Sequence, residues 1–187
     1  MKKITIIILV IIGSLFAFDT NGQSFEKGDN ILNAGLGFGY YGYGFVYNRS
    51  FSIPAITANY EVGLGEFIGV GPYVGIASWN YSGSGFNGGY SIFAVGGRAT
   101  FHLTDVLLNE LLELDVDEKW DFYATLIMGL NFDLYSGDFQ NIEANQVRLS
   151  AGPIFGFRYL FSKNFGMYLE GGRGSFSYGT IGLSLKM

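Results

Sequence analysis

Residues 146–161, QVRLSAGPIFGFRYLF, alternate between two kinds of side chain. One phase is apolar and consists of Val147, Leu149, Ala151, Pro153, Phe155, Phe157, Tyr159 and Phe161. The other phase is mostly small or polar and includes Gln146, Arg148, Ser150, Gly152, Gly156 and Arg158. Because successive side chains of a strand point to opposite faces, one face of this strand suits hydrocarbon and the other does not. The pattern predicts a membrane-spanning β-strand.

The same alternation recurs along the chain in segments of about ten residues, the length that spans a bilayer as a tilted strand. The expected strands cover about residues 30–40, 55–63, 68–76, 91–103, 121–135, 146–161, 165–172 and 178–187. An unpaired backbone cannot sit in lipid, so these strands must close, and eight strands leave a lumen that side chains nearly fill. We therefore predict an all-β fold, an eight-stranded antiparallel up-and-down transmembrane β-barrel over residues 23–187.

Composition favours lipid over water as the surroundings of this barrel. Charged residues make up 14% of the 187-residue chain, which contains 29 Gly and no Cys. A soluble barrel of the lipocalin kind, with the same alternation turned inside out, is the alternative. It would present many Lys, Glu and Thr to water, whereas the second phase here is rich in Gly and Ala. The net charge of −5 gives no electrostatic case for nucleic acid binding.

The first residues have the features of a secretory signal peptide. Lys2 and Lys3 precede an apolar run from Ile4 to Phe18, and a polar stretch with small residues follows. A transmembrane anchor is the alternative, but it needs about 20 apolar residues, more than this run supplies. We expect residues 1–22 to be removed after Gly22.

The connections then fall on two sides of the membrane. With both termini in the periplasm, short periplasmic turns are expected near Leu64 and Lys163, and a longer one at residues 104–119. This longer turn has leucines at helical spacing behind Thr104 and Asp105 as N-caps, and it carries several acids. It predicts either a short amphipathic helix over the barrel mouth or a docking surface for an envelope partner. The expected extracellular loops are residues 41–54, 79–90, 136–143 and 173–177.

The signal peptide, the eight strands and the last strand together resemble the small outer-membrane β-barrel proteins of Gram-negative bacteria, the OmpX and OmpA-barrel type. The last strand carries Ile181, Leu183, Leu185 and Met187. The resemblance implies a bacterial outer-membrane location, contact with lipid and lipopolysaccharide, and recognition of that strand by the barrel-assembly machinery. Family members usually end in Phe, where this chain has Met187.

Six charged side chains are expected to form a network in the lumen: Glu61, Arg98, Asp133, Arg148, Arg158 and Glu170. Arg158 and Glu170 should meet across the hairpin of residues 146–172, and Asp133 and Arg148 across the preceding one. Because an unpaired charge in a narrow lumen is costly, opposite charges at matching heights predict a plug. A narrow or gated channel for small solutes is the alternative, since switching of salt bridges can open a lumen.

Catalysis, metal binding and cofactor binding have little support in the sequence. A lipid-modifying enzyme would need a base near the outer leaflet, but the sole histidine, His102, falls at the periplasmic end of its strand. The glycine-rich tracts at residues 35–39 and 171–174 lack the strand-to-helix context of a phosphate site. We expect a non-enzymatic structural or interaction protein with no cofactor and no metal.

Overall fold

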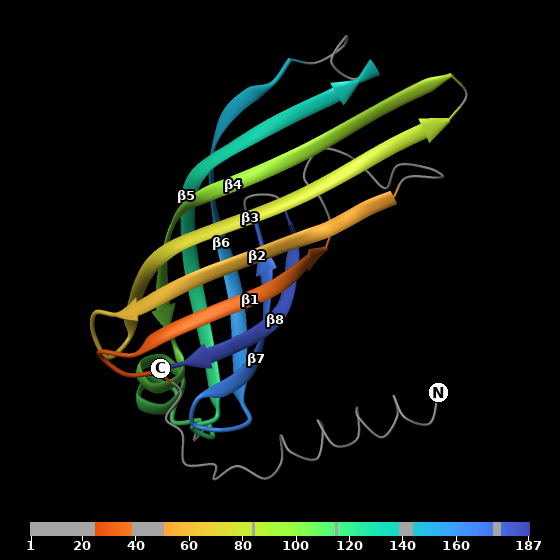
Figure 1. Ribbon diagram of the computed structural model, residues 1–187. Coiled ribbons are helices and arrows are strands. Elements are labelled where there is room, and N and C mark those ends of the chain that lie inside the picture. The colour runs from red at the N-terminus through yellow and green to blue at the C-terminus, as the bar shows by residue number, and fades with distance from the viewer. Residues whose placement is uncertain (1–24, 39–50, 84, 115, 139–143, 174–176) are drawn as a thin grey trace, which may run out of the picture.

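The computed structural model describes residues 25–38, 51–83, 85–114, 116–138, 144–173 and 177–187. Its strands are β1 Asn30–Phe38, β2 Phe51–Gly63, β3 Ile68–Gly83, β4 Phe86–His102, β5 Trp120–Gly137, β6 Gln146–Leu160, β7 Phe165–Gly172 and β8 Gly179–Lys186. Each pairs antiparallel with the next, and β8 pairs with β1, so the sheet closes into a barrel (Figure 1). The predicted eight-stranded up-and-down fold is confirmed. The expected signal peptide lies outside the described residues.

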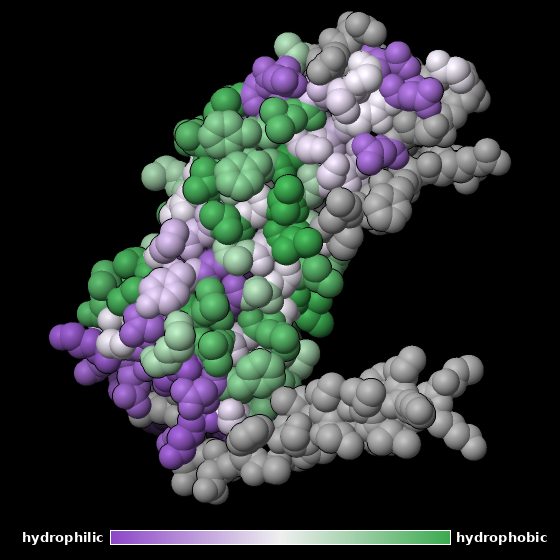
Figure 2. All heavy atoms as spheres, viewed as in Figure 1, coloured by the Kyte–Doolittle hydropathy of each residue, from purple (hydrophilic) through white to green (hydrophobic). Residues whose placement is uncertain are grey.

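The two phases of each strand face opposite sides of the barrel wall. On β6, Leu149 is 74% exposed and Phe155 is also exposed, whereas Arg158 is buried inside. On β5, Leu126 is exposed and its neighbour Thr125 is buried. Apolar side chains cover much of the wall in Figure 2, and hydrophilic residues gather towards its ends. A closed barrel with an apolar exterior and a polar interior is the arrangement of a transmembrane β-barrel.

Aromatic rings line one rim of the barrel, on the outside of β5, β6 and β7. Neighbouring rings contact one another, with centroids 4.7 Å apart for Trp120 and Tyr159 and 6.2 Å apart for Phe161 and Phe165. Phe101 of β4 contacts Phe67 in the same way, at 5.2 Å. These rings lie where an interfacial girdle is expected. The rim also holds the turns at residues 64–67 and 161–164, as well as Met187.

The barrel wall is taller on one side than on the other. The pairing of β6 with β7 ends at Ile154 and Gly172, although β6 begins at Gln146. In Figure 1, β3, β4 and β5 rise above β7, β8 and β1. The prediction of an extracellular loop at residues 79–90 is wrong, because β3 and β4 remain paired from Trp79–Tyr90 to Gly83–Phe86. Between Trp79 and Tyr90 backbone pairing continues without apolar alternation, so this Gly- and Ser-rich hairpin end resembles a loop in sequence.

The long turn between β4 and β5 contains the π-helix η1, Thr104–Leu111. The backbone N–H of Leu108 donates to the carbonyl of Leu103 at 3.0 Å, a wider turn than an α-helix makes. The hydroxyl of Thr104, a predicted N-cap, accepts from the backbone N–H of Phe122 on β5 at 2.8 Å. Among the described residues, no helix has the length and apolar character needed to cross a membrane.

Candidate functional site: the charged layer inside the barrel

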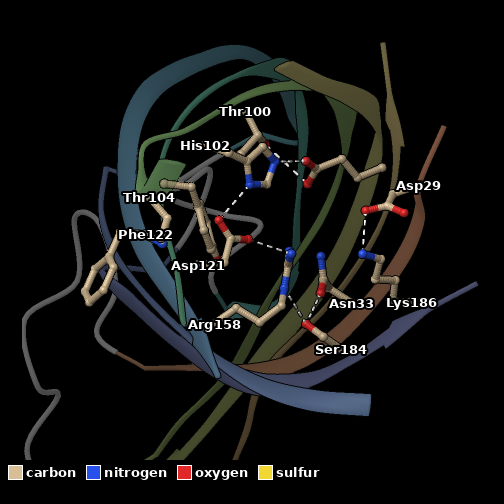
Figure 3. Close-up of polar contacts among 12 residues, drawn as sticks. Asp29, Asn33, Thr100, His102, Thr104, Asp121, Phe122, Arg158, Ser184 and Lys186 are labelled. Carbon is tan, nitrogen blue, oxygen red and sulfur yellow. Dashed lines mark hydrogen bonds and ion pairs between the residues drawn. The ribbon is translucent and has the colours of Figure 1, made fainter. Parts of the chain in front are cut away.

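Charged side chains gather in the lumen near the rim that carries the aromatic girdle. We call them the ionic layer: Glu61 of β2, Arg98 and His102 of β4, Asp121 of β5, Arg158 of β6 and Glu170 of β7. Each is buried, and each lies in the inward phase of its strand. The closed sheet thus brings together residues that are up to 109 positions apart in sequence, from Glu61 to Glu170. Figure 3 shows the part of this layer around His102 and Arg158.

His102 lies between two carboxylates. Its Nε2 is 2.7 Å from Oε1 of Glu61, and its Nδ1 is 2.8 Å from Oδ1 of Asp121. Ionised carboxylates only accept hydrogen bonds, and a neutral imidazole carries only one N–H. Both contacts are satisfied at once when the ring carries both protons. This geometry fits an imidazolium that bridges Glu61 and Asp121.

Arg158 extends this chain of contacts to the other side of the lumen. Its Nη1 donates to Oδ2 of Asp121 at 2.8 Å, and its Nε donates to the hydroxyl of Ser184 on β8 at 3.1 Å. Ser184 in turn donates to Asn33 of β1, whose side-chain amide donates to Asn59 of β2 at 2.8 Å. Figure 3 shows Arg158 reaching towards Asp121 and Ser184. The contacts connect β4, β5, β6, β8, β1 and β2 around the barrel.

Arg98 forms a second branch that crosses the lumen to β7. Its Nη2 donates to Oε1 of Glu170 at 2.8 Å and to the hydroxyl of Thr125 at 3.2 Å. The hydroxyl of Tyr123 also donates to Glu170, at 3.1 Å. Thr100 links this branch to the first, because its hydroxyl donates to Glu61 at 3.4 Å. With His102 protonated, the three acids and the three bases of the ionic layer balance.

Strand β3 contributes space to the ionic layer. A Cβ atom at Gly69 would lie 2.1 Å from Oε1 of Glu61, which is closer than any side chain can approach. Across the barrel, a Cβ at Gly156 would lie 2.6 Å from the ring of Tyr123. The inward glycines of the sequence therefore make room for the large side chains of neighbouring strands.

A second layer, further from the girdle rim, is apolar. We call it the apolar layer: Ala55, Tyr73, Ala77, Tyr90, Ile92, Ala94, Ile127, Tyr135 and Ile154. All of these side chains are buried, and Ile92 is fully so. On β4 they precede Arg98 and His102, and on β5 they follow Asp121. Because these two strands run antiparallel, the apolar layer lies above the ionic layer. This layer was not predicted from the sequence, although Ile92 and Ile127 lie in the inward phase of their strands.

At the level of the apolar layer, with Asp133 directly opposite Ile92, Asp133 and Arg148 form the pair expected from the sequence. Nη2 of Arg148 donates to Oδ1 of Asp133 at 3.0 Å, and Nε of Arg148 also donates to this carboxylate. The hydroxyl of Tyr90 donates to Asp133 at 2.8 Å. The Arg148 side chain is 46% exposed, whereas Asp133 is buried. This pair is therefore separate from the ionic layer and reaches solvent.

The pairing expected between Arg158 and Glu170 is wrong. In the described residues Arg158 pairs with Asp121 and Glu170 pairs with Arg98. The strand register explains why Arg158 pairs with Asp121. Asp121 on β5 is directly opposite Arg158, whereas the residue opposite Arg158 on β7 is Tyr168. Arg158 therefore pairs with Asp121, its direct neighbour, and not with Glu170, which is displaced by two residues.

The ionic layer offers no open site to a ligand in the described residues. No group of three or more His, Cys, Asp or Glu side chains there could hold a metal ion. Both ring nitrogens of His102 are held by carboxylates, and the ring of Phe25 covers its face with centroids 3.4 Å apart. What the arrangement can do is fill and close the lumen.

The last strand, β8, closes the barrel against β1. Its register runs from Ile31–Lys186 to Phe38–Gly179. The four residues predicted for recognition by the assembly machinery, Ile181, Leu183, Leu185 and Met187, are all exposed. The first three lie on the apolar exterior of β8.

Solved structures of bacterial outer-membrane proteins are similar to this barrel. OprG from Pseudomonas aeruginosa matches with a TM-score of 0.50 and 11% identity, over 90% of this chain and 99% of OprG. Ail, the attachment invasion locus protein of Yersinia pestis, matches with a TM-score of 0.47 and 14% identity, over 86% and 95%. The N-terminal barrel of OprF from Pseudomonas aeruginosa gives 0.43 and 10%, over 87% and 98%.

No protein-family model and no curated protein matches the sequence. At 11% identity the OprG match bears on the fold alone. Together with the closed eight-stranded sheet, it confirms the resemblance predicted from the sequence at the level of fold. This chain has the fold of the small eight-stranded outer-membrane β-barrels.

Proposed function

We propose that this protein is an integral barrel of the bacterial outer membrane, delivered there after removal of residues 1–22, and that its role is structural or interaction-based. Its apolar exterior supports contact with outer-membrane lipid and lipopolysaccharide. The packing of its lumen is the main support for this role. Across the described strands, the ionic layer and the apolar layer fill it one above the other.

Two closed layers oppose conduction for different reasons. An ion that passed the ionic layer would have to separate pairs such as Arg98–Glu170, and breaking a buried pair typically costs about 3–5 kcal/mol. It would then meet the apolar layer, whose own side chains carry no charge and where the carboxylate of Asp133 is already paired with Arg148. We therefore favour a plugged barrel over the alternative, a narrow or gated channel for small solutes.

Planar-bilayer recording tests this proposal. The folded barrel should add no current steps above the lipid baseline over the voltage range that the membrane tolerates. A porin reconstituted in parallel provides the positive control. Reproducible small steps would favour the gated channel and contradict the plug.

The tall wall formed by β2 to β6 is the surface that we propose for interactions outside the cell. It rises above β7, β8 and β1 and lifts polar residues such as Asn80 away from the membrane. A photo-crosslinker on Asn80→Cys tests it in the native envelope, since the chain has no other cysteine. Lys163→Cys, at the opposite end, is the matched control. A product specific to residue 80 supports the proposal, and equal labelling from both sites argues against it.

The turn at residues 104–119 is the surface that we propose for an envelope partner in the periplasm. Leu111, Leu112 and Leu114 are all exposed, with Leu111 at 70%, so they do not pack over the barrel mouth. Exposed Glu110 and Glu113 flank them. The barrel-assembly machinery is a separate proposed partner, acting through β8.

We propose no enzymatic role. The one histidine of the chain is enclosed by two carboxylates and a phenyl ring, which leaves no nitrogen for a substrate. Incubation with lipopolysaccharide followed by lipid mass spectrometry should show no change in acylation. A shift in acyl-chain mass that depends on the barrel would contradict this.

A further inference from the structure

Phe25, the first described residue, is turned into the barrel rather than out into solvent. Its side chain is 2% exposed. Its ring lies parallel to the imidazole of His102, with an interplanar angle of 9° and a centroid distance of 3.4 Å. A large apolar side chain therefore covers the ionic layer at the girdle end of the lumen.

The residues that follow Phe25 form a tight turn that fixes this position. The backbone N–H of Glu26 donates to Oδ2 of Asp29 at 2.7 Å, and the N–H of Asp29 donates back to the carbonyl of Glu26 at 3.2 Å. Gly28 makes the turn possible with a φ of 92°, a value that favours glycine. The chain is thereby folded back on itself just before β1 begins.

The same turn is attached to two strands of the barrel. The N–H of Gly28 donates to the carbonyl of Gly63 at the end of β2 at 3.0 Å, and the N–H of Gly63 donates to the carbonyl of Asp29 at 2.8 Å. Gly63 has no room for a side chain, since a Cβ there would lie 2.5 Å from the carbonyl oxygen of Glu26. On the other side, Nζ of Lys186 on β8 pairs with Asp29 at 2.8 Å (Figure 3).

We propose that residues 25–29 are a latch and that Phe25 is its stopper, which seals the ionic layer from periplasmic water. The ring suits this task chemically. The face of an aromatic ring attracts a cation, and His102 presents the face of an imidazolium to it. Exclusion of water also strengthens the contacts of His102 with Glu61 and Asp121 in the low-dielectric lumen. The periplasmic orientation rests on the proposed function.

The latch and the apolar layer have separable tasks. Loss of the stopper should admit water to the ionic layer, but the apolar layer above it should still block ions. Phe25→Ala is therefore expected to change proton exchange at His102 without producing conductance. Phe161→Ala is the matched control, because Phe161 is the same residue type at the same rim but contacts Tyr159 and Phe165 outside.

Because the chain has a single histidine, NMR of the folded barrel in lipid nanodiscs tests the latch directly. In the parent, the two ring N–H protons of His102 should be visible in slow exchange with water, and the rings of Phe25 and His102 should show mutual NOEs. Phe25→Ala should lose the ring N–H signals through exchange, and Phe161→Ala should keep them. Both variants must migrate as folded barrels in unheated SDS gels.

Unchanged N–H exchange in folded Phe25→Ala would overturn the latch. If that variant does not fold, the parent alone decides: absence of NOEs between the two rings overturns the proposal, and their presence supports it. Conductance tests whether the apolar layer closes the lumen. Current steps from Phe25→Ala would show that the apolar layer fails to close the lumen, which counts against the proposed function and leaves the latch standing.

Discussion

The two layers of the lumen fill the same barrel by opposite means. The ionic layer joins strands through charge-assisted hydrogen bonds such as those of Asp121 to His102 and Arg158. The apolar layer packs side chains such as Ile92 and Ile127 with no ion pair among its members. Removal of one member should leave an orphaned charge in the first layer, whereas removal of an aliphatic member of the second should leave only a cavity. Closure near the girdle therefore depends on specific partners, whereas closure above it depends on volume.

The largest effect is expected from breaking the pair between Asp121 and Arg158. Arg158→Gln or Asp121→Asn alone should lower the free energy of unfolding by about 3–5 kcal/mol, because each leaves a buried charge without its partner. The double variant should recover part of this loss. Urea-driven unfolding in lipid vesicles measures the cycle. Additive losses would show that the two side chains act independently and would remove the main contact of the ionic layer.

The matching change in the apolar layer is Ile92→Ala, at a fully buried position. It should lower the free energy of unfolding by about 2–4 kcal/mol through lost burial and the cavity left behind. Ile92→Leu, which keeps the volume, should cost less than about 1.5 kcal/mol. Equal losses for the two variants would mean that specific shape, and not volume, governs this layer.

The exterior provides a contrast to both layers. Leu126 of β5 lies on the lipid side of the wall, and Leu134 lies on the same face nearer the top of the strand. Leu126→Arg should cost about 2–4 kcal/mol if it lies near the membrane midplane, and Leu134→Arg about 0–1 kcal/mol near the interface. The reverse order in the same vesicle unfolding assay would place the membrane at a different height on the barrel.

The smallest effect is expected at the pair of Asp133 and Arg148, since the guanidinium side chain is 46% exposed. Arg148→Gln should cost about 1 kcal/mol, because an exposed guanidinium contributes little and the hydroxyl of Tyr90 still donates to the buried Asp133. The comparison with Arg158→Gln uses the same substitution on the same strand. A loss as large as that of Arg158→Gln would show that both ends of the lumen are closed by charge.

The sequence predicted which side chains of each strand face outwards, because alternation alone sets this. Leu149 and Phe155 therefore fell outside and Arg158 inside, as the structure has them. The partners of the inward residues were harder to predict. Asp121 lies directly opposite Arg158, and correct register between the two strands would have revealed the pair.

Other contacts depend on closure of the barrel and leave no trace in the spacing of residues. Arg98 reaches Glu170 from β4 to β7 across the lumen, between strands that do not pair. The contact between Phe25 and His102 likewise depends on a turn that precedes the first strand. Sequence periodicity describes a flat strand, and these contacts arise only when the sheet curves into a cylinder.

The ionic layer is complete and balanced in charge when His102 is an imidazolium between Glu61 and Asp121. Nitrogen NMR of the single histidine at neutral pH tests this most directly. We expect both ring nitrogens to be protonated, each with a directly bonded proton signal. One protonated and one bare nitrogen would contradict it, because a neutral ring cannot donate to both carboxylates.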